Sequence, residues 1–153
     1  MSSTSTPDQV DVRGPRFVAW VTTAVLIATL ATAAVSTSAA AVILGLQTVV
    51  FAIGAWRGPR EHPYGRVFAA VIARRLGPAT EREPVPPLKF AQLVGFAFAA
   101  VGTAGFAFGV PALGLVATGF ALFAAFLNAA FGICLGCQLY PFIARLRRAP
   151  APS

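Results

Sequence analysis

Four long apolar stretches decide what this chain can fold into. A helix needs roughly 20 mostly apolar residues to cross the hydrocarbon core of a bilayer. With 57% hydrophobic and 11% charged residues, the chain is also too apolar for an ordinary soluble domain. We therefore predict an all-α, polytopic membrane protein with one domain over residues 12–147 and disordered tails over residues 1–11 and 148–153. The expected spans are residues 17–35, 40–56, 88–109 and 113–140.

The connections between these stretches predict how the helices pair. The first two are separated by the polar Ser-Thr-Ser of residues 36–38, and the last two by the Val-Pro-Ala of residues 110–112. Connections this short join antiparallel neighbours, so we expect a four-helix bundle of two hairpins joined by a longer loop over residues 57–87. Two G-x-x-x-G spacings are typical of helix backbones that approach closely in membranes: Gly105 with Gly109, and Gly132 with Gly136.

The basic residues predict the orientation of the helices. Of the 12 Lys and Arg residues, 11 lie before the first stretch, in the central loop or after the last stretch, and Lys89 lies where the central loop enters the third stretch. None lies at a hairpin tip. Cytoplasmic flanks collect Lys and Arg, so both termini and the central loop are expected to face the cytoplasm. This accounts for the net charge of +7 without a nucleic-acid partner, which would need basic residues on a solvated domain. Alternatively, residues 1–35 are a cleaved signal peptide, although their apolar run is longer than usual.

Part of the central loop has the pattern of an amphipathic helix. Phe68, Ile72 and Leu76 recur at i, i+4 and i+8, while Arg66 and Arg74 fall on another face. This pattern favours a helix that lies at the cytoplasmic interface of the membrane.

The two cysteines of the chain, Cys134 and Cys137, form a C-x-x-C near the end of the last apolar stretch. Residues three apart on a helix have Cβ atoms roughly 5–6 Å apart, so the two thiols can reach disulfide geometry with modest adjustment. They can equally supply two thiolates to a soft metal ion, or pack as small hydrophobes. Gly132 and Gly136 remove side-chain bulk beside them, and Pro141 is expected to bend the helix one turn later.

The sequence leaves the reactivity of these thiols open. The negative end of a helix dipole disfavours a thiolate, whereas nearby arginines such as Arg145 or Arg147 favour one. Cys137 is nearer the expected cytoplasmic boundary, so we assign it as the attacking thiol and Cys134 as the resolving thiol.

A few polar residues accompany the apolar stretches. Gln47, Gln92 and Asn128 lie within expected spans, where they form hydrogen bonds between helices or line a polar pocket leading to the thiols. His62 is the only histidine, which argues against a bis-histidine haem. No cofactor is predicted, but under the metal interpretation His62 would join the two cysteines as a third ligand. Tyr140 is expected to anchor at the interface or to assist proton transfer.

Several segments carry a family resemblance: VRGPRF, LQTVVFAIGAWRGPREHPYGRVF, PPLKFAQLVGFAFAAVG and FLNAAFGICLGCQLY. Together they resemble the bacterial integral-membrane family known as domain of unknown function 4395, in particular its actinobacterial members, over about residues 11–147. The resemblance implies a location in the bacterial plasma membrane and an association with thioredoxin-like or rhodanese-like sulfurtransferase proteins, hence thiol or sulfur chemistry at the C-x-x-C. A looser similarity is to vitamin K epoxide reductase-like enzymes, but the second cysteine pair needed for their relay is absent from this sequence.

Three functions follow from these observations. The first is thiol–disulfide or sulfur exchange through Cys134 and Cys137 with a cytoplasmic thioredoxin-like or sulfurtransferase partner, which would supply the redox step that one cysteine pair lacks. The second is a carrier for a soft metal or sulfur species, to which small mercury-transport membrane proteins are similar. The third is a structural membrane subunit with inert cysteines.

Overall fold

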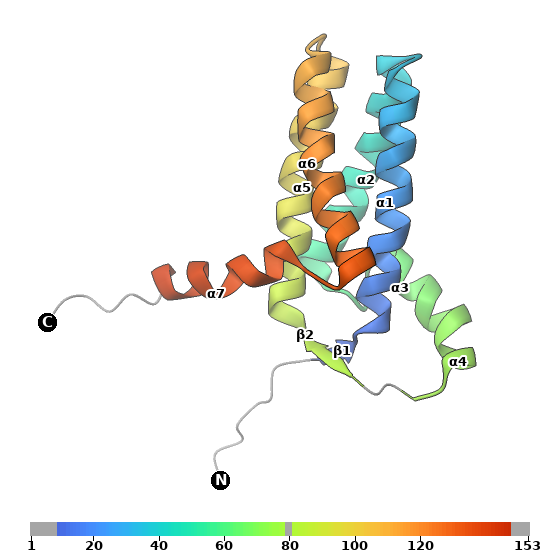
Figure 1. Cartoon of the computed structure of the whole chain (residues 1–153), viewed down its shortest axis with the longest axis vertical. Coiled ribbons are helices and arrows are strands. Elements are labelled where there is room, and N and C mark those ends of the chain that lie inside the picture. Colours follow the sequence, from blue (N-terminus) through green and yellow to red (C-terminus); the bar gives the residue numbers. More distant parts are fainter. Residues whose placement is uncertain (1–8, 79–80, 148–153) are drawn as a thin grey trace, which may run out of the picture.

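Four long helices form the body of the molecule (Figure 1). The computed structural model describes residues 9–78 and 81–147. Each long helix is long and apolar enough to cross a membrane, which confirms the predicted all-α membrane bundle. The helices begin two to four residues earlier than predicted, because a first turn, whose N–H groups lack intrahelical partners, tolerates proline and polar residues. They are α1 (Arg13–Ala33), α2 (Thr37–Arg57), α5 (Val85–Ala107) and α6 (Pro111–Phe131).

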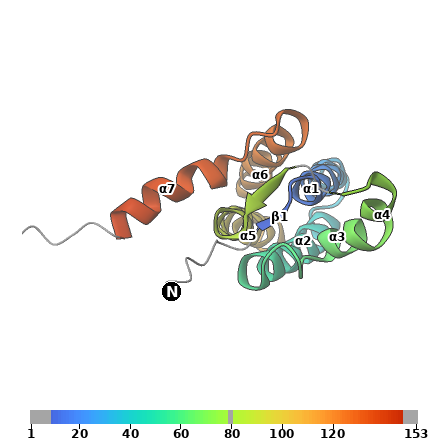
Figure 2. The same ribbon diagram turned by 90° about the horizontal axis from the view of Figure 1, so that it is seen from below.

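The four helices pack around a common interior, visible from below in Figure 2. α1 contacts α2 and α6, and α5 contacts the same two helices. Leu26, Leu44 and Ala99 are fully buried in the interior, whereas Val42 and Phe120 on the outside are 64% and 59% exposed. Large apolar side chains on the outer surface are expected of helices that meet lipid.

Neither of the two predicted glycine pairs lies on a single helix, and the first pair, Gly105 and Gly109, straddles the end of α5. A Cβ at Gly105 would come within 2.6 Å of the Gly114 nitrogen, so this glycine allows α5 and α6 to approach closely. Gly109 lies beyond the end of α5 with a φ of 81°. It therefore serves the turn between the helices rather than their packing.

The segment between α2 and α5 is helical over residues 63–76, as α3 (Pro63–Val67), the π-helical η1 (Phe68–Ile72) and α4 (Ala73–Leu76). Phe68 is buried, and its ring lies 5.8 Å from that of Phe17, while Val71 is 55% exposed. Placement of this segment at a membrane interface stays a prediction.

Two short strands, β1 (Gln9–Asp11) and β2 (Arg82–Pro84), pair antiparallel below the bundle. Arg13 forms an ion pair with Asp11 and donates hydrogen bonds to the carbonyls of Leu76 and Gly77. The expectation of disorder was therefore wrong for residues 9–11, whose backbone groups are satisfied by pairing. Residues 1–8 and 148–153, the rest of the expected tails, lie outside the described structure.

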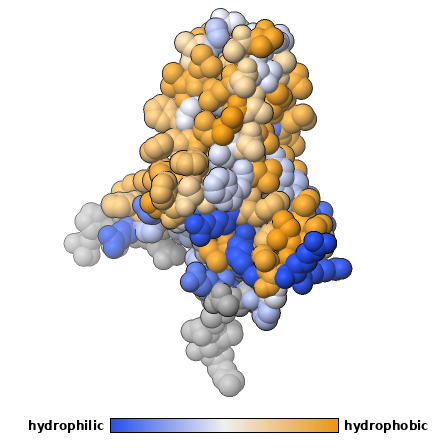
Figure 3. All heavy atoms as spheres, turned by 45° about the vertical axis from the view of Figure 1, so that its right-hand side comes forward, coloured by the Kyte–Doolittle hydropathy of each residue, from blue (hydrophilic) through white to orange (hydrophobic). Residues whose placement is uncertain are grey.

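Charge is distributed unevenly over the surface. The upper part of the face seen in Figure 3 is mostly apolar, and the strongly hydrophilic residues gather at the lower end, where α1 begins. The segment between α2 and α5 and the start of the last helix, α7 (Leu135–Arg147), lie at this same end (Figure 1).

Candidate functional site at the start of α7

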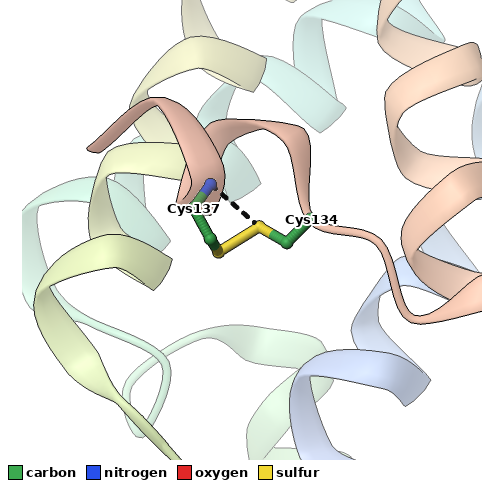
Figure 4. Close-up of a disulfide and its surroundings, with 2 residues drawn as sticks. All are labelled: Cys134 and Cys137. Atoms are coloured by element: carbon green, nitrogen blue, oxygen red, sulfur yellow. Dashed lines mark hydrogen bonds between the residues drawn. A yellow bond between two sulfur atoms is a disulfide. The ribbon is translucent and has the colours of Figure 1, made fainter. Parts of the chain in front are cut away.

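Cys134 and Cys137 form a disulfide at the start of a fifth substantial helix, α7 (Leu135–Arg147) (Figure 4). Their Cα atoms are 5.1 Å apart. The Cys134 carbonyl accepts the N–H of Gln138, and its Sγ accepts the N–H of Cys137 at a distance of 3.1 Å. Cys134 therefore takes the position of an N-cap residue, with its sulfur in place of the usual capping oxygen.

This arrangement corrects the prediction of one continuous helix over residues 113–140. α6 ends at Phe131, because Gly132 adopts a φ of 70° and its N–H returns to the carbonyl of Asn128. Only glycine enters this left-handed region without a steric penalty. α7 then leaves the bundle at a steep angle (Figures 1 and 2). Gly132 and Gly136 therefore do not share a helix face, and the chain turns before the cysteines rather than at Pro141, which lies inside α7.

The sign of the helix dipole at the thiols is reversed as a result. The pair lies at the positive, N-terminal end of α7 instead of the negative end of a spanning helix. A helix N-terminus favours a thiolate and lowers the pKa of a cysteine. The structure thus supplies an activating influence on Cys134 that the predicted helix would have opposed.

Two contacts fasten the start of α7 to α5. A Cβ at Gly136 would lie 2.6 Å from the Cα of Ala91, so only glycine permits this close approach. One turn later, the ring of Tyr140 lies 6.1 Å from that of Phe90. Tyr140 therefore packs against a neighbouring helix.

Arg16 of α1 reaches the end of α6. Its Nε donates to the carbonyl of Ala129 at 3.3 Å, and its Nη2 donates to that of Ala130 at 3.5 Å. These carbonyls belong to the last turn of α6, where a cation is favoured. The sequence identified Arg16 only as one of the basic residues before the first apolar stretch, and it left open whether Arg145 or Arg147 approaches the thiols. The Arg147 side chain and all of Arg148 lie outside the described structure.

A cavity of about 350 Å³ lies among α1, α5, α6 and α7, and Cys134 forms part of its lining. Its other polar lining residues are Thr22, His62, Gln92 and Asn128. The walls are otherwise mainly apolar and include Phe51, Phe98, Phe120 and Phe123. Cys137 does not line it. Two of the polar residues expected within spans, Gln92 and Asn128, thus line a pocket that also reaches one thiol.

His62 is held neutral in the wall of this cavity. It is 1% exposed, its Nδ1 accepts the N–H of Tyr64 at 3.2 Å, and its Nε2 lies 3.1 Å from Oε1 of Gln92. Since Nδ1 accepts and the amide oxygen needs a donor, the proton is on Nε2. Burial lowers the pKa of His62 to about 4. Gly54 makes room for the ring, because a Cβ there would lie 2.6 Å from Cδ2 of His62.

The remaining predicted polar residue, Gln47, lies elsewhere in the interior. It accepts a hydrogen bond of 2.7 Å from the hydroxyl of Tyr64, and its buried Nε2 has no partner. His62 and Cys134 share the cavity lining. Within residues 9–78 and 81–147, however, no three His, Cys, Asp or Glu side chains group into a metal site.

Comparison with known proteins now assigns the family. The family model described as domain of unknown function (DUF4395) matches residues 10–145. The chain belongs to the DUF4395 family. This confirms the resemblance seen in the sequence, and the matched region contains all four spanning helices and both cysteines. No curated protein and no solved structure matches the chain.

Two of the contributors to the site, Arg16 and Thr22, were not identified from the sequence as site residues. Arg16 acts through a contact with α6, a helix distant in sequence, and Thr22 is part of the site only because α1, α5, α6 and α7 enclose the cavity. The C-x-x-C itself was the strongest signal.

Proposed function

We propose that this protein exchanges disulfides, or sulfur, between its Cys134–Cys137 pair and a cytoplasmic thioredoxin-like or sulfurtransferase partner. The observation that carries the proposal is the position of the pair at the N-terminus of α7, where Cys134 Sγ accepts a backbone N–H. Such a setting stabilises a thiolate, which is the reactive form in exchange.

The two sulfurs have different surroundings, which supports different roles. Cys134 lines the cavity, whereas Cys137 does not. A partner thiolate attacks Sγ of Cys137, the bond between the two sulfurs breaks, and Cys134 leaves as the thiolate that the helix N-terminus stabilises. A second partner thiol then attacks the mixed disulfide and releases Cys137. The partner dithiol is thereby oxidised, and two electrons and two protons pass to the pair. In the reverse direction Cys137 attacks and Cys134 resolves.

A trapping experiment tests this assignment on the unaltered chain. The probe is reduced thioredoxin whose resolving cysteine is replaced by serine, added to the oxidised protein in detergent, followed by alkylation and peptide mapping. We expect the mixed disulfide on Cys137 and the alkyl group on Cys134. The single-cysteine variants are tested with the same probe activated as its mixed disulfide with 5-thio-2-nitrobenzoate, from which an attacking thiolate displaces thionitrobenzoate. Cys134→Ser should be trapped through Cys137, and Cys137→Ser is the matched control with little trapping. Equal trapping at both sulfurs would overturn the separate roles.

We further propose that the pair faces the cytoplasm of a bacterial cell, with both termini on that side. The support is that the described Lys and Arg residues lie near the start of α1, the end of α2 and the start of α5, in the segment between α2 and α5, or within α7, and that hydrophilic residues gather at the lower end of the bundle (Figure 3). Labelling with a membrane-impermeant maleimide in right-side-out and inverted vesicles tests it. We expect labelling after reduction in inverted vesicles only. Labelling that depends on a chelator would instead favour a soft-metal carrier, and full function of a variant lacking both cysteines would favour a structural subunit.

A further inference from the structure

We propose that the cavity beside Cys134 binds the ring of a lipid-soluble quinone, which accepts the electrons that the cysteine pair receives from its partner. This inference rests on the proposed thiol exchange for the source of electrons. The binding site itself stands on the cavity alone.

The walls of the cavity suit a flat, apolar ligand that arrives from the membrane. Its volume of about 350 Å³ lies within the range of small-molecule sites. Phe98, Phe120 and Phe123 line it and are also 37%, 59% and 58% exposed. The cavity therefore reaches the outer surface of α5 and α6, which meets hydrocarbon when these helices span a bilayer.

The lining excludes charged ligands. No Asp, Glu, Lys or Arg contributes to it among the described residues, and His62 is neutral. A phosphate group or a metal ion would lose its hydration there without a compensating charge. A neutral ring with carbonyl oxygens would lose far less hydration free energy on entering the cavity.

The cavity also offers hydrogen-bond donors without a carbonyl to receive them. Thr22 is 2% exposed, and its hydroxyl has no partner. The neighbouring Thr23 instead donates to the carbonyl four residues earlier, at 2.7 Å. A buried, unpaired hydroxyl costs free energy, and a ligand carbonyl in the cavity would remove that cost. Gln92 engages its amide oxygen with His62 and so retains its N–H donors for a ligand.

The chemistry of a quinone matches that of the adjacent pair. In the reduced state, the thiols of Cys134 and Cys137 each lose a proton and together give up two electrons as the S–S bond forms. The quinone takes both electrons and both protons and becomes a hydroquinone with two new O–H bonds. Cys134, the sulfur that lines the cavity, is the one placed to meet the ring.

Binding is tested first, with a short-chain ubiquinone whose fully substituted ring does not add thiols. Equilibrium dialysis against the oxidised protein in detergent should give saturable binding. Ala124→Phe, which fills the cavity, should abolish it, whereas the exposed Ala112→Phe is the matched control and should not. Thr22→Val should weaken binding about 5–10-fold, as expected for one lost hydrogen bond, and Thr23→Val should not. Non-saturable partitioning that is the same in every variant would mean that the cavity holds only lipid chains, and would overturn the proposal.

Electron transfer is tested second, by mixing the dithiol form anaerobically with the same quinone. We expect one hydroquinone per disulfide formed, at a rate that saturates with quinone and falls at least tenfold in Ala124→Phe. Normal trapping of thioredoxin without quinone reduction would overturn this inference and leave the proposed function intact. If chemically reduced protein reduces the quinone but never reacts with thioredoxin, the proposed exchange with a thioredoxin-like partner is wrong and the quinone site stands.

Discussion

Substituting Gly136 by alanine tests whether the contact between α7 and α5 holds the cysteine pair over the cavity. The added Cβ would lie 2.6 Å from Cα of Ala91 and 2.8 Å from its Cβ. Real Cβ atoms essentially never approach within 3.0 Å, so α7 has to move by roughly 0.8 Å to reach the 3.4 Å of ordinary contact. Such overpacking costs about 1–3 kcal/mol. The better helix propensity of alanine offsets about 1 kcal/mol of this cost.

Gly119→Ala on α6 is the matched control, because nothing lies within 4 Å of its added Cβ. This variant should gain about 1 kcal/mol, so the two variants should differ in unfolding free energy by about 1–3 kcal/mol. Denaturant unfolding in mild detergent measures the difference, and the rate of maleimide labelling after reduction reports on the site. We expect faster labelling in Gly136→Ala. Equal stability and equal labelling in both variants would refute the role of this contact.

Three further predictions follow from contacts around the site. His62, with its pKa lowered to about 4 from 6.5, stays neutral when folded but gains a proton in the unfolded chain. The unfolding free energy should therefore be fully retained above pH 6.5 and fall by up to about 3 kcal/mol toward pH 4; His62→Gln should flatten this pH profile. Gly132→Ala should lose about 1–2 kcal/mol of stability and Gly132→Asn less, since asparagine tolerates a positive φ better; thermal unfolding in detergent compares them. Tyr64→Phe should lose about 1–3 kcal/mol by leaving the Gln47 oxygen unpaired. The double variant Tyr64→Phe/Gln47→Leu should recover most of it in denaturant titration, and no recovery would contradict the hydrogen bond.

The helices were predictable because hydropathy and length are local properties. The C-terminal end of the last predicted helix, residues 113–140, could not be predicted in the same way. FGICLGCQLY is apolar almost throughout, so hydropathy alone extends the span through it, whereas the chain actually turns on the backbone angle of Gly132. That one residue reverses the electrostatic argument for the thiols, because it decides whether they follow a helix or precede one.

Features formed by segments that are distant in the chain could not be predicted from the sequence. β1 and β2 are only three residues long and carry no strand periodicity, yet they pair across more than 70 residues. The contact of Arg16 with the end of α6 and the cavity with its unpaired Thr22 likewise depend on how four helices pack. The C-x-x-C was recognisable from spacing, but its surroundings were not.

The place of α7 in the chain has a consequence for biogenesis. All four spanning helices precede the cysteines, so a ribosome completes the entire membrane-embedded portion before it synthesises either thiol. Domains generally fold as they emerge, N-terminal parts first. The surface of α5 that receives Gly136 is therefore synthesised before α7, and α7 can dock only after that surface has formed. A chain released just after Phe131 would already contain all four long helices and would lack the two cysteines that can be oxidised.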